Sequence, residues 1–379
     1  MNWSIDNDTT TSTLRFPKCS YKITTAMTTP LPPTKPPLTL YTSIASIRQW
    51  RRGQANQRKS VAMVPTMGAL HAGHISLLRS AARTHDSLVI SIFVNPAQFA
   101  PHEDLSRYPR TLTTDIKQLE VLNTELSSPE SSSKGRIEAL FVPPVPEMYP
   151  SGIPLQQELQ KGAFVTVTPL SSRLEGITRP HFFRGVATVC MKLFNIVQPD
   201  EVYFGQKDVQ QTVVLKWMVG DLHVPTKIRV EDTIREEDGL AMSSRNVYLG
   251  EKRRGFATCL YKALKAAEEA YLQEVAKGAK VIPKRILTEP AEKMLREAGS
   301  DEVKTETEYF SVACPRGLEE LEQVDVSVGA VISGAVKMLP TQEGEGPVRI
   351  IDNIILKSKA ETSTQEARTS QDLRTVVSV

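Results

Sequence analysis

Two histidines three residues apart, His71 and His74, stand in a short polar loop that also contains Gly68 and Gly73. An apolar run rich in β-branched residues precedes this loop, and apolar residues at helical spacing follow it. The pattern predicts a buried strand, a tight loop and a helix that opens near His74. The free N–H groups and the positive dipole end of such a helix favour phosphate, so we expect a nucleotide to bind here.

On its own, H-x-G-H is as compatible with a solvated polar loop as with a nucleotide site. The loop lacks both G-x-x-x-x-G-K-[ST] and G-x-G-x-x-G, the two common phosphate-binding motifs. A pair of histidines could also bind a metal ion, but no third ligand follows at ordinary zinc spacing. The polar residues of other loops therefore decide between these interpretations.

Three further polar clusters interrupt the apolar pattern. Two of them follow predicted strands directly, and the third lies in the loop after the strand predicted at 227–232. They are FVNPAQF, with Asn95 and Gln98; YFGQKDVQQ, with Lys207, Asp208 and Gln211; and AMSSRN, with Ser243, Ser244 and Arg245. Lysine and arginine neutralise phosphate, and arginine can do so with a bidentate fork. Asp208 is a candidate magnesium ligand, because magnesium commonly takes one or two carboxylates plus substrate phosphates. The neutral amides of Gln98 and Gln211 suit hydroxyl and carboxylate groups of a small polar substrate.

Each of these clusters, taken alone, is more often a surface ion pair, a turn or a capping residue. Together with the histidine loop they make four polar clusters predicted at one edge of one sheet, which indicates a shared site. The sequence has no Ser-His-Asp or Cys-His arrangement at a recognisable elbow. It therefore gives no case for a covalent nucleophile.

Length and composition indicate a globular enzyme with room for two domains. The chain has 379 residues, of which 40% are hydrophobic and 23% charged. Its 46 basic and 43 acidic residues leave a net charge of +3, so neither nucleic acid nor an anionic membrane is expected as a partner. The four cysteines lack C-x-x-C pairing, so we expect free thiols in a reducing compartment. They are Cys19, Cys190, Cys259 and Cys314.

The elements that must position these loops alternate between strand and helix. Strands are predicted at 60–65, 87–94, 139–144, 164–169, 201–204 and 227–232, and helices at 44–52, 74–84, 113–121, 185–197 and 209–222, with a flexible insertion at 127–136. Such alternation with apolar strands predicts an α/β fold, a Rossmann-like parallel sheet covered on both faces. Its ligand should lie beyond the carboxyl ends of the strands.

The remaining segments predict a second, smaller α+β domain and two tails. A polar loop precedes a long helix at 251–276, and further helical segments to 298 are followed by strands at 309–313, 325–333 and 348–356. The predicted organisation is a disordered tail at 1–38, a Rossmann-like domain at 39–232, a lid domain at 233–357 and a disordered tail at 358–379. The first tail is rich in Thr, Ser and Pro. We expect a cytoplasmic protein, with a mitochondrial transit peptide as the alternative.

Five motifs, in this order, resemble the pantothenate synthetase (pantoate–β-alanine ligase) family of the nucleotidyltransferase superfamily. They are PTMGALHAGH, FVNPAQF, RP-x-F-x-GV before KLFNIVQPD, FGQKDVQQ and DGLAMSSRN, and the resemblance covers about residues 40–357. It implies a reaction in two steps. ATP and pantoate give pantoyl adenylate and pyrophosphate, and β-alanine then attacks the acyl group to give pantothenate and AMP. It also implies a homodimer, whereas Mg²⁺ is expected from the candidate ligand Asp208.

The resemblance further implies roles for individual residues. His74, Lys207 and Arg245 are expected to be catalytic, Gln98 and Gln211 to bind pantoate, and Asp208 to bind the metal. Binding of ATP is expected from Met67, Gly68, His71, Gly73, His74, Gly205, Lys207, Asp208, Ile234, Met242, Ser243, Ser244 and Arg245. Among these, Ile234 would touch the adenine, and Met242 to Arg245 would close over the triphosphate from the second domain.

One segment departs from the family pattern R-P-G-H-F-x-G-V. Here it reads RPHFFRGV, with His181 at the glycine position and Phe182 at the histidine position. Both residues are left out of the predicted site, and Arg179 is kept as a candidate phosphate contact. Two rival functions stay open, a nucleotidyltransferase that makes a dinucleotide or CDP product and a catalytically silent binding protein with the same fold.

Overall fold

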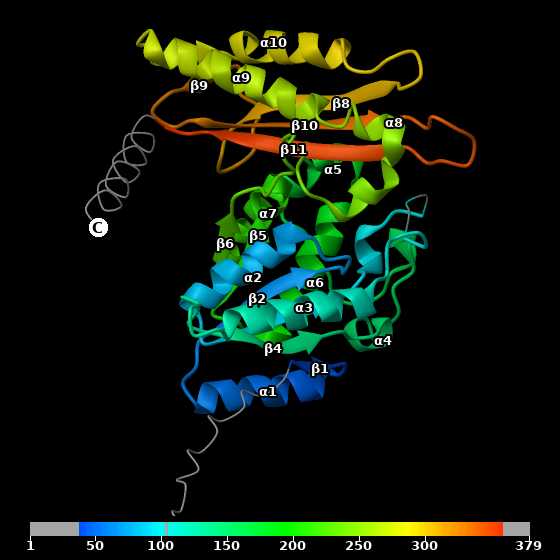
Figure 1. Ribbon diagram of the computed structural model, residues 1–379, viewed down its shortest axis with the longest axis vertical. Coiled ribbons are helices and arrows are strands. Elements are labelled where there is room, and N and C mark those ends of the chain that lie inside the picture. The colour runs from blue at the N-terminus through cyan, green and yellow to red at the C-terminus, as the bar shows by residue number, and fades with distance from the viewer. Residues whose placement is uncertain (1–37, 102, 104, 359–379) are drawn as a thin grey trace, which may run out of the picture. The chain divides into compact units, whose positions relative to one another are not determined.

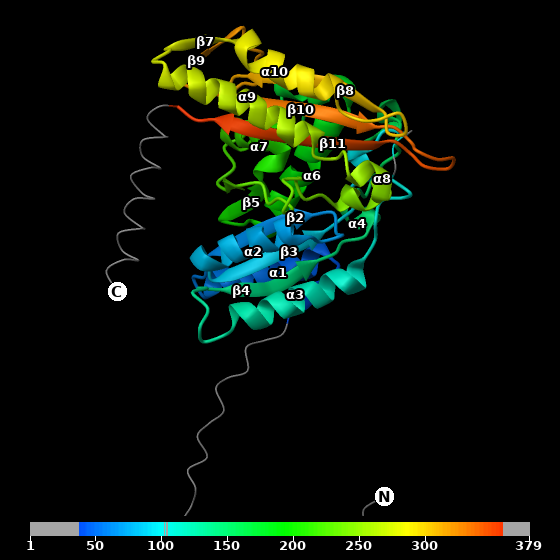
Figure 2. The ribbon, with the colours of Figure 1, turned by 45° about the horizontal axis from the view of Figure 1, so that its top comes forward.

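The strands after the first helix are buried on both faces, so the sheet they form must be covered by helices on both sides. In β2 (Val61–Thr66) and β3 (Ser87–Ile92) nearly every residue is buried, as expected for strands with helices on both sides. The structure, a computed structural model, describes residues 38–101, 103 and 105–358. Figures 1 and 2 show these strands enclosed between helices.

Six strands form one parallel sheet in the order β1-β4-β3-β2-β5-β6. Besides β2 and β3, its strands are β1 (Thr39–Tyr41), β4 (Arg136–Phe141), β5 (Glu201–Gly205) and β6 (Lys227–Glu231). The chain runs outward from β2 through β3 to β4 and then returns to the other side of β2 with β5. The loops after β2 and β5 therefore flank the topological switch point, where open α/β sheets bind their ligands.

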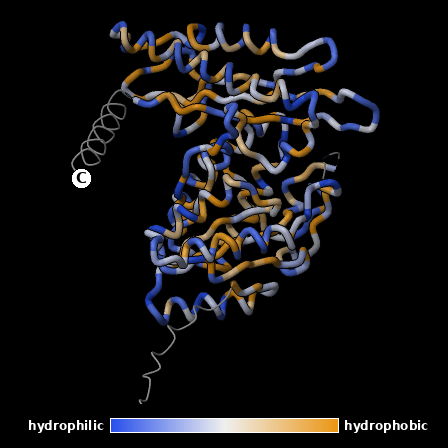
Figure 3. The backbone as a smooth tube through the Cα atoms, in the orientation of Figure 1, coloured by the Kyte–Doolittle hydropathy of each residue, from blue (hydrophilic) through white to orange (hydrophobic). Residues whose placement is uncertain are grey.

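Alternate side chains of each strand enter two separate cores. On one face, Met63 packs in a core with α1 (Ile44–Asn56), α6 (Phe182–Val197) and α7 (Val209–Asp221). On the other face, Val64 packs with α2 (Ala72–Thr84) and α3 (Leu112–Leu126). Hydrophobic residues accordingly gather along the strands in Figure 3. The predicted Rossmann-like sheet is confirmed.

The C-terminal region combines helices with antiparallel sheets, which confirms the α+β class predicted for it. β8 (Thr305–Ala313), β10 (Ala330–Met338) and β11 (Val348–Leu356) pair in the order β11-β10-β8. Helices α9 (Cys259–Ala276) and α10 (Lys284–Arg296) pack their apolar side chains on one face of this sheet. The other face carries polar side chains, among them Tyr309, whose hydroxyl bonds to Glu175 between β4 and β5, and Asn353, whose amide bonds to the turn after β5.

Short elements complete the described chain. They are β7 (Val281–Pro283), β9 (Gln323–Asp325), α4 (Val145–Met148), α5 (Glu175–Thr178), α8 (Gly250–Arg254) and the 3₁₀ turns η1 (Pro96–Gln98), η2 (Gln157–Leu159), η3 (Leu170–Ser172), η4 (Gln206–Asp208) and η5 (Ser244–Tyr248). Among the described helices, none has the length and apolarity needed to cross a membrane. Three cysteines, Cys190, Cys259 and Cys314, are free as predicted, and Cys19 lies outside the described residues.

Three predicted elements are wrong in place or extent. Residues 164–169 form no strand, because Pro169 lacks a donor and the Val165 N–H bonds to Thr188 Oγ1 at 2.9 Å instead of a neighbouring strand. The helix predicted at 251–276 is split into α8 and α9 by a turn that begins at Gly255. The strand predicted at 325–333 begins only at Ala330, because the Asp325 carboxylate accepts the Ser327 N–H and folds a turn.

Other elements keep their type but shift at their ends. The strand predicted at 139–144 is β4, which begins three residues earlier, and the helices predicted at 44–52 and 113–121 extend further as α1 and α3. The segment predicted as an insertion is the loop between α3 and β4. Most of both predicted tails lies outside the described residues.

Candidate active site

The histidine loop is fixed by hydrogen bonds between its own rings and the start of α2. His71 is the N-cap, and its Nδ1 accepts the Gly73 N–H at 3.2 Å. The His74 Nδ1 accepts the His71 N–H at 3.4 Å, so the two residues form a reciprocal capping box. Position 73 must be glycine, because a Cβ atom there would lie 2.8 Å from Cε1 of His71.

This arrangement sets the protonation of both imidazoles. A ring nitrogen that accepts an N–H bond carries no proton, so the remaining proton of each neutral ring sits on Nε2. Burial and the nearby Lys207 lower the pKa of His71 to about 4. Burial, His71 and Lys207 lower the pKa of His74 to about 3. At neutral pH the two rings, 4.1 Å apart between centroids, are therefore uncharged donors.

A carboxylate from α3 supports the same loop from behind. Asp115, which is 1% exposed, accepts the N–H groups of Ala69 at 3.1 Å and Leu70 at 2.9 Å. Gly68 has a φ of +85°, and a Cβ atom there would approach both Ile92 and Asp115. Glycine is therefore required at position 68 to turn the backbone. Gly68 does not line the cleft, unlike the rest of the predicted ATP site.

The turn after β5 brings a cation to the histidines. Lys207 lies in η4, and its Nζ lies 3.4 Å from the Asp208 carboxylate. Lys207 lines the same cleft as His71 and His74, and its charge contributes to the lowered pKa of both histidines. Gly205 lines the cleft, and no atom lies within 4 Å of where its Cβ would be, so the backbone is open to a ligand.

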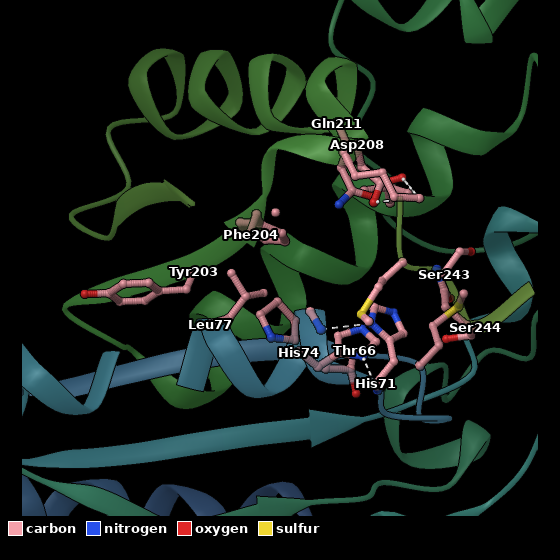
Figure 4. Close-up of a pocket in the computed structure, with 18 of the residues that line it drawn as sticks. Thr66, His71, His74, Leu77, Tyr203, Phe204, Asp208, Gln211, Ser243 and Ser244 are labelled. Atoms are coloured by element: carbon pink, nitrogen blue, oxygen red, sulfur yellow. Dashed lines mark hydrogen bonds and ion pairs between the residues drawn. The ribbon is translucent and has the colours of Figure 1, made fainter. Parts of the chain in front are cut away.

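A loop beyond β6 closes the opposite side of the cleft. Ser244 Oγ donates a 3.0 Å hydrogen bond to the Ala69 carbonyl of the histidine loop. Ser243 Oγ accepts the Arg245 N–H at 3.2 Å and so caps η5. Figure 4 shows both serines facing His71 and His74 from a separate segment, with Asp208 and Gln211 on a third. Loops distant in sequence thus converge on one hollow.

An amide pair lies at the end of β3. The Gln98 Oε1 accepts from Asn95 Nδ2 at 3.1 Å, and its Nε2 points to Met67 Sδ at 3.2 Å. Asn95 is 1% exposed, and its Oδ1 accepts the Tyr149 hydroxyl at 2.7 Å. Burial raises the pKa of Tyr149, so this hydroxyl stays a donor. The Gln98 amide is thereby oriented.

The structure brings the other predicted site residues together. The predicted residues that line the cleft are Met67, His71, Gly73, His74, Gln98, Gly205, Lys207, Asp208, Gln211, Ile234, Met242, Ser243, Ser244 and Arg245. Lys207 and His74 therefore share one space. Arg179, the candidate phosphate contact, is not among the lining residues, because its guanidinium is bound by the Glu103 carboxylate at 2.6 and 2.8 Å.

Other residues of the cleft were not part of the predicted site. Tyr108 lies beneath Arg245, whose guanidinium carbon is 5.6 Å from the ring centroid, and Phe182 adds an apolar wall. Thr233 also lines the cleft, and its buried hydroxyl has no hydrogen-bond partner within the described ranges. Thr233 lies two residues after the end of β6, so the rule that ligands bind beyond the carboxyl ends of parallel strands could have indicated it. Nothing in the sequence near Tyr108 indicates its position.

The cleft could hold a divalent cation only together with a ligand's own oxygen atoms. Across residues 38–101, 103 and 105–358, no three His, Cys, Asp or Glu side chains are grouped as a metal site. Asp208 offers one carboxylate, and its side chain is 43% exposed. That donor set fits Mg²⁺ shared with phosphate oxygens.

A parallel sheet with polar loops converging at its switch point is typical of α/β proteins of the Rossmann-like class that bind a ligand there. A sequence profile described as Pantoate-beta-alanine ligase matches residues 39–355. The chain belongs to the pantoate–β-alanine ligase family. It is therefore an enzyme, and the reaction of this family is the ATP-dependent condensation of pantoate with β-alanine.

Similar proteins match nearly over their full length. The pantoate–β-alanine ligase of Saccharomyces cerevisiae is 42% identical over 323 residues, 84% of this chain and 99% of the yeast protein. The pantothenate synthetase of Chloroflexus aggregans is 42% identical over 313 residues, 83% of this chain and 99% of that protein.

Two solved structures share the fold. Pantothenate synthetase from Thermus thermophilus has a TM-score of 0.67 and 36% identity, and the match covers 84% of this chain and 100% of that one. The ligase from Francisella tularensis, solved with an ATP compound and β-alanine, has a TM-score of 0.61 and 28% identity, and covers 84% of this chain and 98% of that one.

Proposed function

We propose that the cleft at the switch point carries out both half-reactions of pantothenate synthesis. ATP and pantoate bind side by side, pantoyl adenylate and pyrophosphate form, and β-alanine then displaces AMP. The observation that carries this proposal is the convergence of the Lys207 turn and the His74 loop on one cleft that Gln98 also lines.

The phosphate end of the proposed site is made of fixed donors. His71 and His74 offer Nε2–H groups, and Lys207 and Arg245 add positive charge. Attack of the pantoate carboxylate on the α-phosphorus builds negative charge on the phosphoryl oxygens and on the departing pyrophosphate. Donors already in place stabilise that charge more in the transition state than in the ground state.

The base and sugar of ATP have a matching surface further along the cleft. Ile234 is 37% exposed and offers an apolar contact for adenine. The Thr233 hydroxyl, without a partner in the described part of the chain, can bond to a polar atom of the base. Gly205 leaves room for the ribose to approach the backbone.

The two glutamines and the apolar wall of the cleft suit pantoate. The amides of Gln98 and Gln211 can bind its hydroxyl and carboxylate groups. Phe182 and Val186 line the same cleft and suit its two methyl groups. This combination is less suited to the second substrate of a dinucleotide-forming or CDP-forming enzyme, so we favour the ligase.

Asp208 would hold Mg²⁺ together with the phosphates, and the ion would then offset charge on the leaving pyrophosphate. The loop carrying Ser244 closes over the histidine loop and excludes water from the acyl adenylate. We also propose a division into domains at 39–232 and 233–357, a homodimer and a cytoplasmic location.

Isotope transfer tests the proposed chemistry. Pantoate labelled with ¹⁸O in its carboxylate is incubated with the protein, ATP, Mg²⁺ and β-alanine. Because the oxygen that attacks phosphorus leaves with AMP, one label per turnover should appear in AMP, and AMP should form at the pantothenate rate only when both acids are present. Label in inorganic phosphate, with ADP as product, would instead show an acyl phosphate and overturn the proposal.

A further inference from the structure

β11, the last strand of the described residues, is hydrogen-bonded to the turn that carries Lys207. Asn353 in β11 is 1% exposed, and its Nδ2 donates to the carbonyls of Gln206 and Lys207, both at 2.9 Å. Its Oδ1 accepts from the Gln206 Nε2 at 3.2 Å. The one amide thus satisfies two backbone carbonyls of η4 and is held by a side chain of the same turn.

The neighbouring residue, Asp352, binds the loop that leads to Arg245. Asp352 is 3% exposed and binds the Arg235 guanidinium with both oxygens, at 2.5 and 3.0 Å. Arg235 begins the segment that leads to Arg245, and this segment folds back on itself through the Met242 N–H, which bonds to the Ile234 carbonyl at 3.0 Å. Because side chains alternate across a strand, Asp352 and Asn353 reach these two loops from opposite faces of β11.

β11 is itself fixed by the C-terminal sheet and its core, so it can hold both loops in fixed positions. Asn353 lies opposite Ser333 in a continuous antiparallel ladder with β10. Ile350 and Leu356 of β11 are buried in the core beneath α9 and α10. Neither Asp352 nor Asn353 lines the cleft, so their effect on a ligand must pass through the loops they hold.

We propose that Asn353 and Asp352 are positioning residues for adenylate formation, which together set the separation of Lys207 and Arg245 across the triphosphate. The inference rests on the proposed function and adds to it a requirement from the C-terminal sheet. Without the Asn353 amide, two carbonyls of η4 lose the donor that ties the turn to β11, so the turn is free to shift. A displacement of about 1 Å at a reacting group can cost on the order of 100-fold in rate.

The first test replaces Asn353 in the full-length chain. Asn353→Ala should slow pantoate-dependent exchange of pyrophosphate into ATP by tenfold or more at saturating ATP. Attack of β-alanine on added pantoyl adenylate should stay within twofold of wild type, because that step no longer needs the triphosphate held. Ile350→Ala, a core substitution in the same strand, is the matched control for loss of stability and should affect the two half-reactions equally.

A double-mutant test separates positioning from general destabilisation. If Asn353 acts through Lys207, adding Asn353→Ala to Lys207→Ala should change the exchange rate by less than twofold. Likewise, Asp352→Asn should have little effect in an Arg245→Ala background. Effects that multiply in the double variants, or an Asn353→Ala variant as active as wild type, would overturn the inference.

Gln206→Ala provides the same test from the side of the turn if Asn353→Ala does not fold. It removes the bond to Asn353 Oδ1 and leaves β11 intact, and it should again slow exchange more than β-alanine attack. Equal effects on both steps would overturn the inference. An absence of exchange in the wild-type protein would overturn the proposed function instead, so the two failures are distinguishable.

Discussion

Ser244 Oγ lies 3.0 Å from the carbonyl oxygen of Ala69 and donates a hydrogen bond to it. The two residues are 175 positions apart in sequence, and the bond closes the loop beyond the parallel sheet onto the histidine loop. It makes one wall of the cleft from two parts of the chain.

Removal of this bond should let water reach the acyl adenylate. A neutral hydrogen bond contributes about 1 kcal/mol, so Ser244→Ala should lower kcat about fivefold. Moles of AMP formed should also exceed moles of pantothenate, because some adenylate is hydrolysed. Ser172→Ala removes a similar hydroxyl-to-carbonyl bond outside the cleft lining and is the control. A one-to-one ratio in Ser244→Ala would show that this contact does not shield the intermediate.

The capping histidine should affect stability through its backbone bond and through its pKa. His71→Asn keeps a side-chain acceptor for the Gly73 N–H, whereas His71→Ala removes it and should cost about 1 kcal/mol of unfolding free energy at pH 7. The measurement is urea denaturation of both variants beside wild type. Equal stability of the two would mean that the cap contributes nothing.

The lowered histidine pKa values also predict how stability changes with pH. The folded pKa of His71, about 4, lies below the unfolded value of 6.5. Between these values the unfolded chain binds more protons, so this contribution to stability is complete above pH 6.5 and is lost as pH falls toward 4. Replacement by Asn should reduce proton uptake on unfolding near pH 5 by up to about one proton. An unchanged slope of stability against pH would contradict the pKa shift.

The buried carboxylate behind the histidine loop should support both folding and ATP binding. Asp115→Ala leaves the N–H groups of Ala69 and Leu70 without their acceptor. Hydrogen bonds to a charged group contribute about 1.5–3 kcal/mol, so the variant should lose roughly that free energy of unfolding and raise the KM for ATP. Asp115→Asn keeps one acceptor oxygen and should be intermediate. A variant with lowered stability but normal ATP KM would limit Asp115 to a folding role.

The orientation of Gln98 should depend on a hydroxyl it does not touch. Tyr149 donates to Asn95, and Asn95 donates to Gln98. Tyr149→Phe should therefore raise the KM for pantoate about fivefold, the equivalent of about 1 kcal/mol, with the KM for ATP little changed. Tyr271→Phe removes another buried hydroxyl that bonds to a backbone carbonyl of the C-terminal region and is the control. A larger change for ATP than for pantoate would reassign this end of the cleft.

Local sequence patterns were sufficient to predict the parallel sheet and the convergence of its polar loops. The strands β2, β3 and β5 are mostly apolar, and polar motifs begin where they end. The convergence of Gln98, His74 and Lys207 therefore follows from their positions after parallel strands. Long-range partners could not be predicted in this way. The hydrogen bonds from Asn353 to η4 depend on how the C-terminal sheet packs, and a local sequence pattern does not predict that packing.

The same limit explains the errors. Residues 164–169 have the composition of a strand, but the Val165 N–H finds the Thr188 hydroxyl and not a neighbouring strand. Arg179 stands in a motif near the site, yet the carboxylate of Glu103 binds it away from the cleft. In both cases a tertiary contact replaced the interaction that the sequence suggested.

The most direct measurement is exchange of labelled pyrophosphate into ATP by the wild-type protein, Lys207→Ala and His74→Ala, each with and without pantoate. We expect exchange only with pantoate, and a rate at least tenfold lower in both variants, equivalent to about 1.4 kcal/mol or more of lost transition-state stabilisation. Exchange at the wild-type rate in both variants would contradict the assignment of this cleft as the place where ATP activates pantoate.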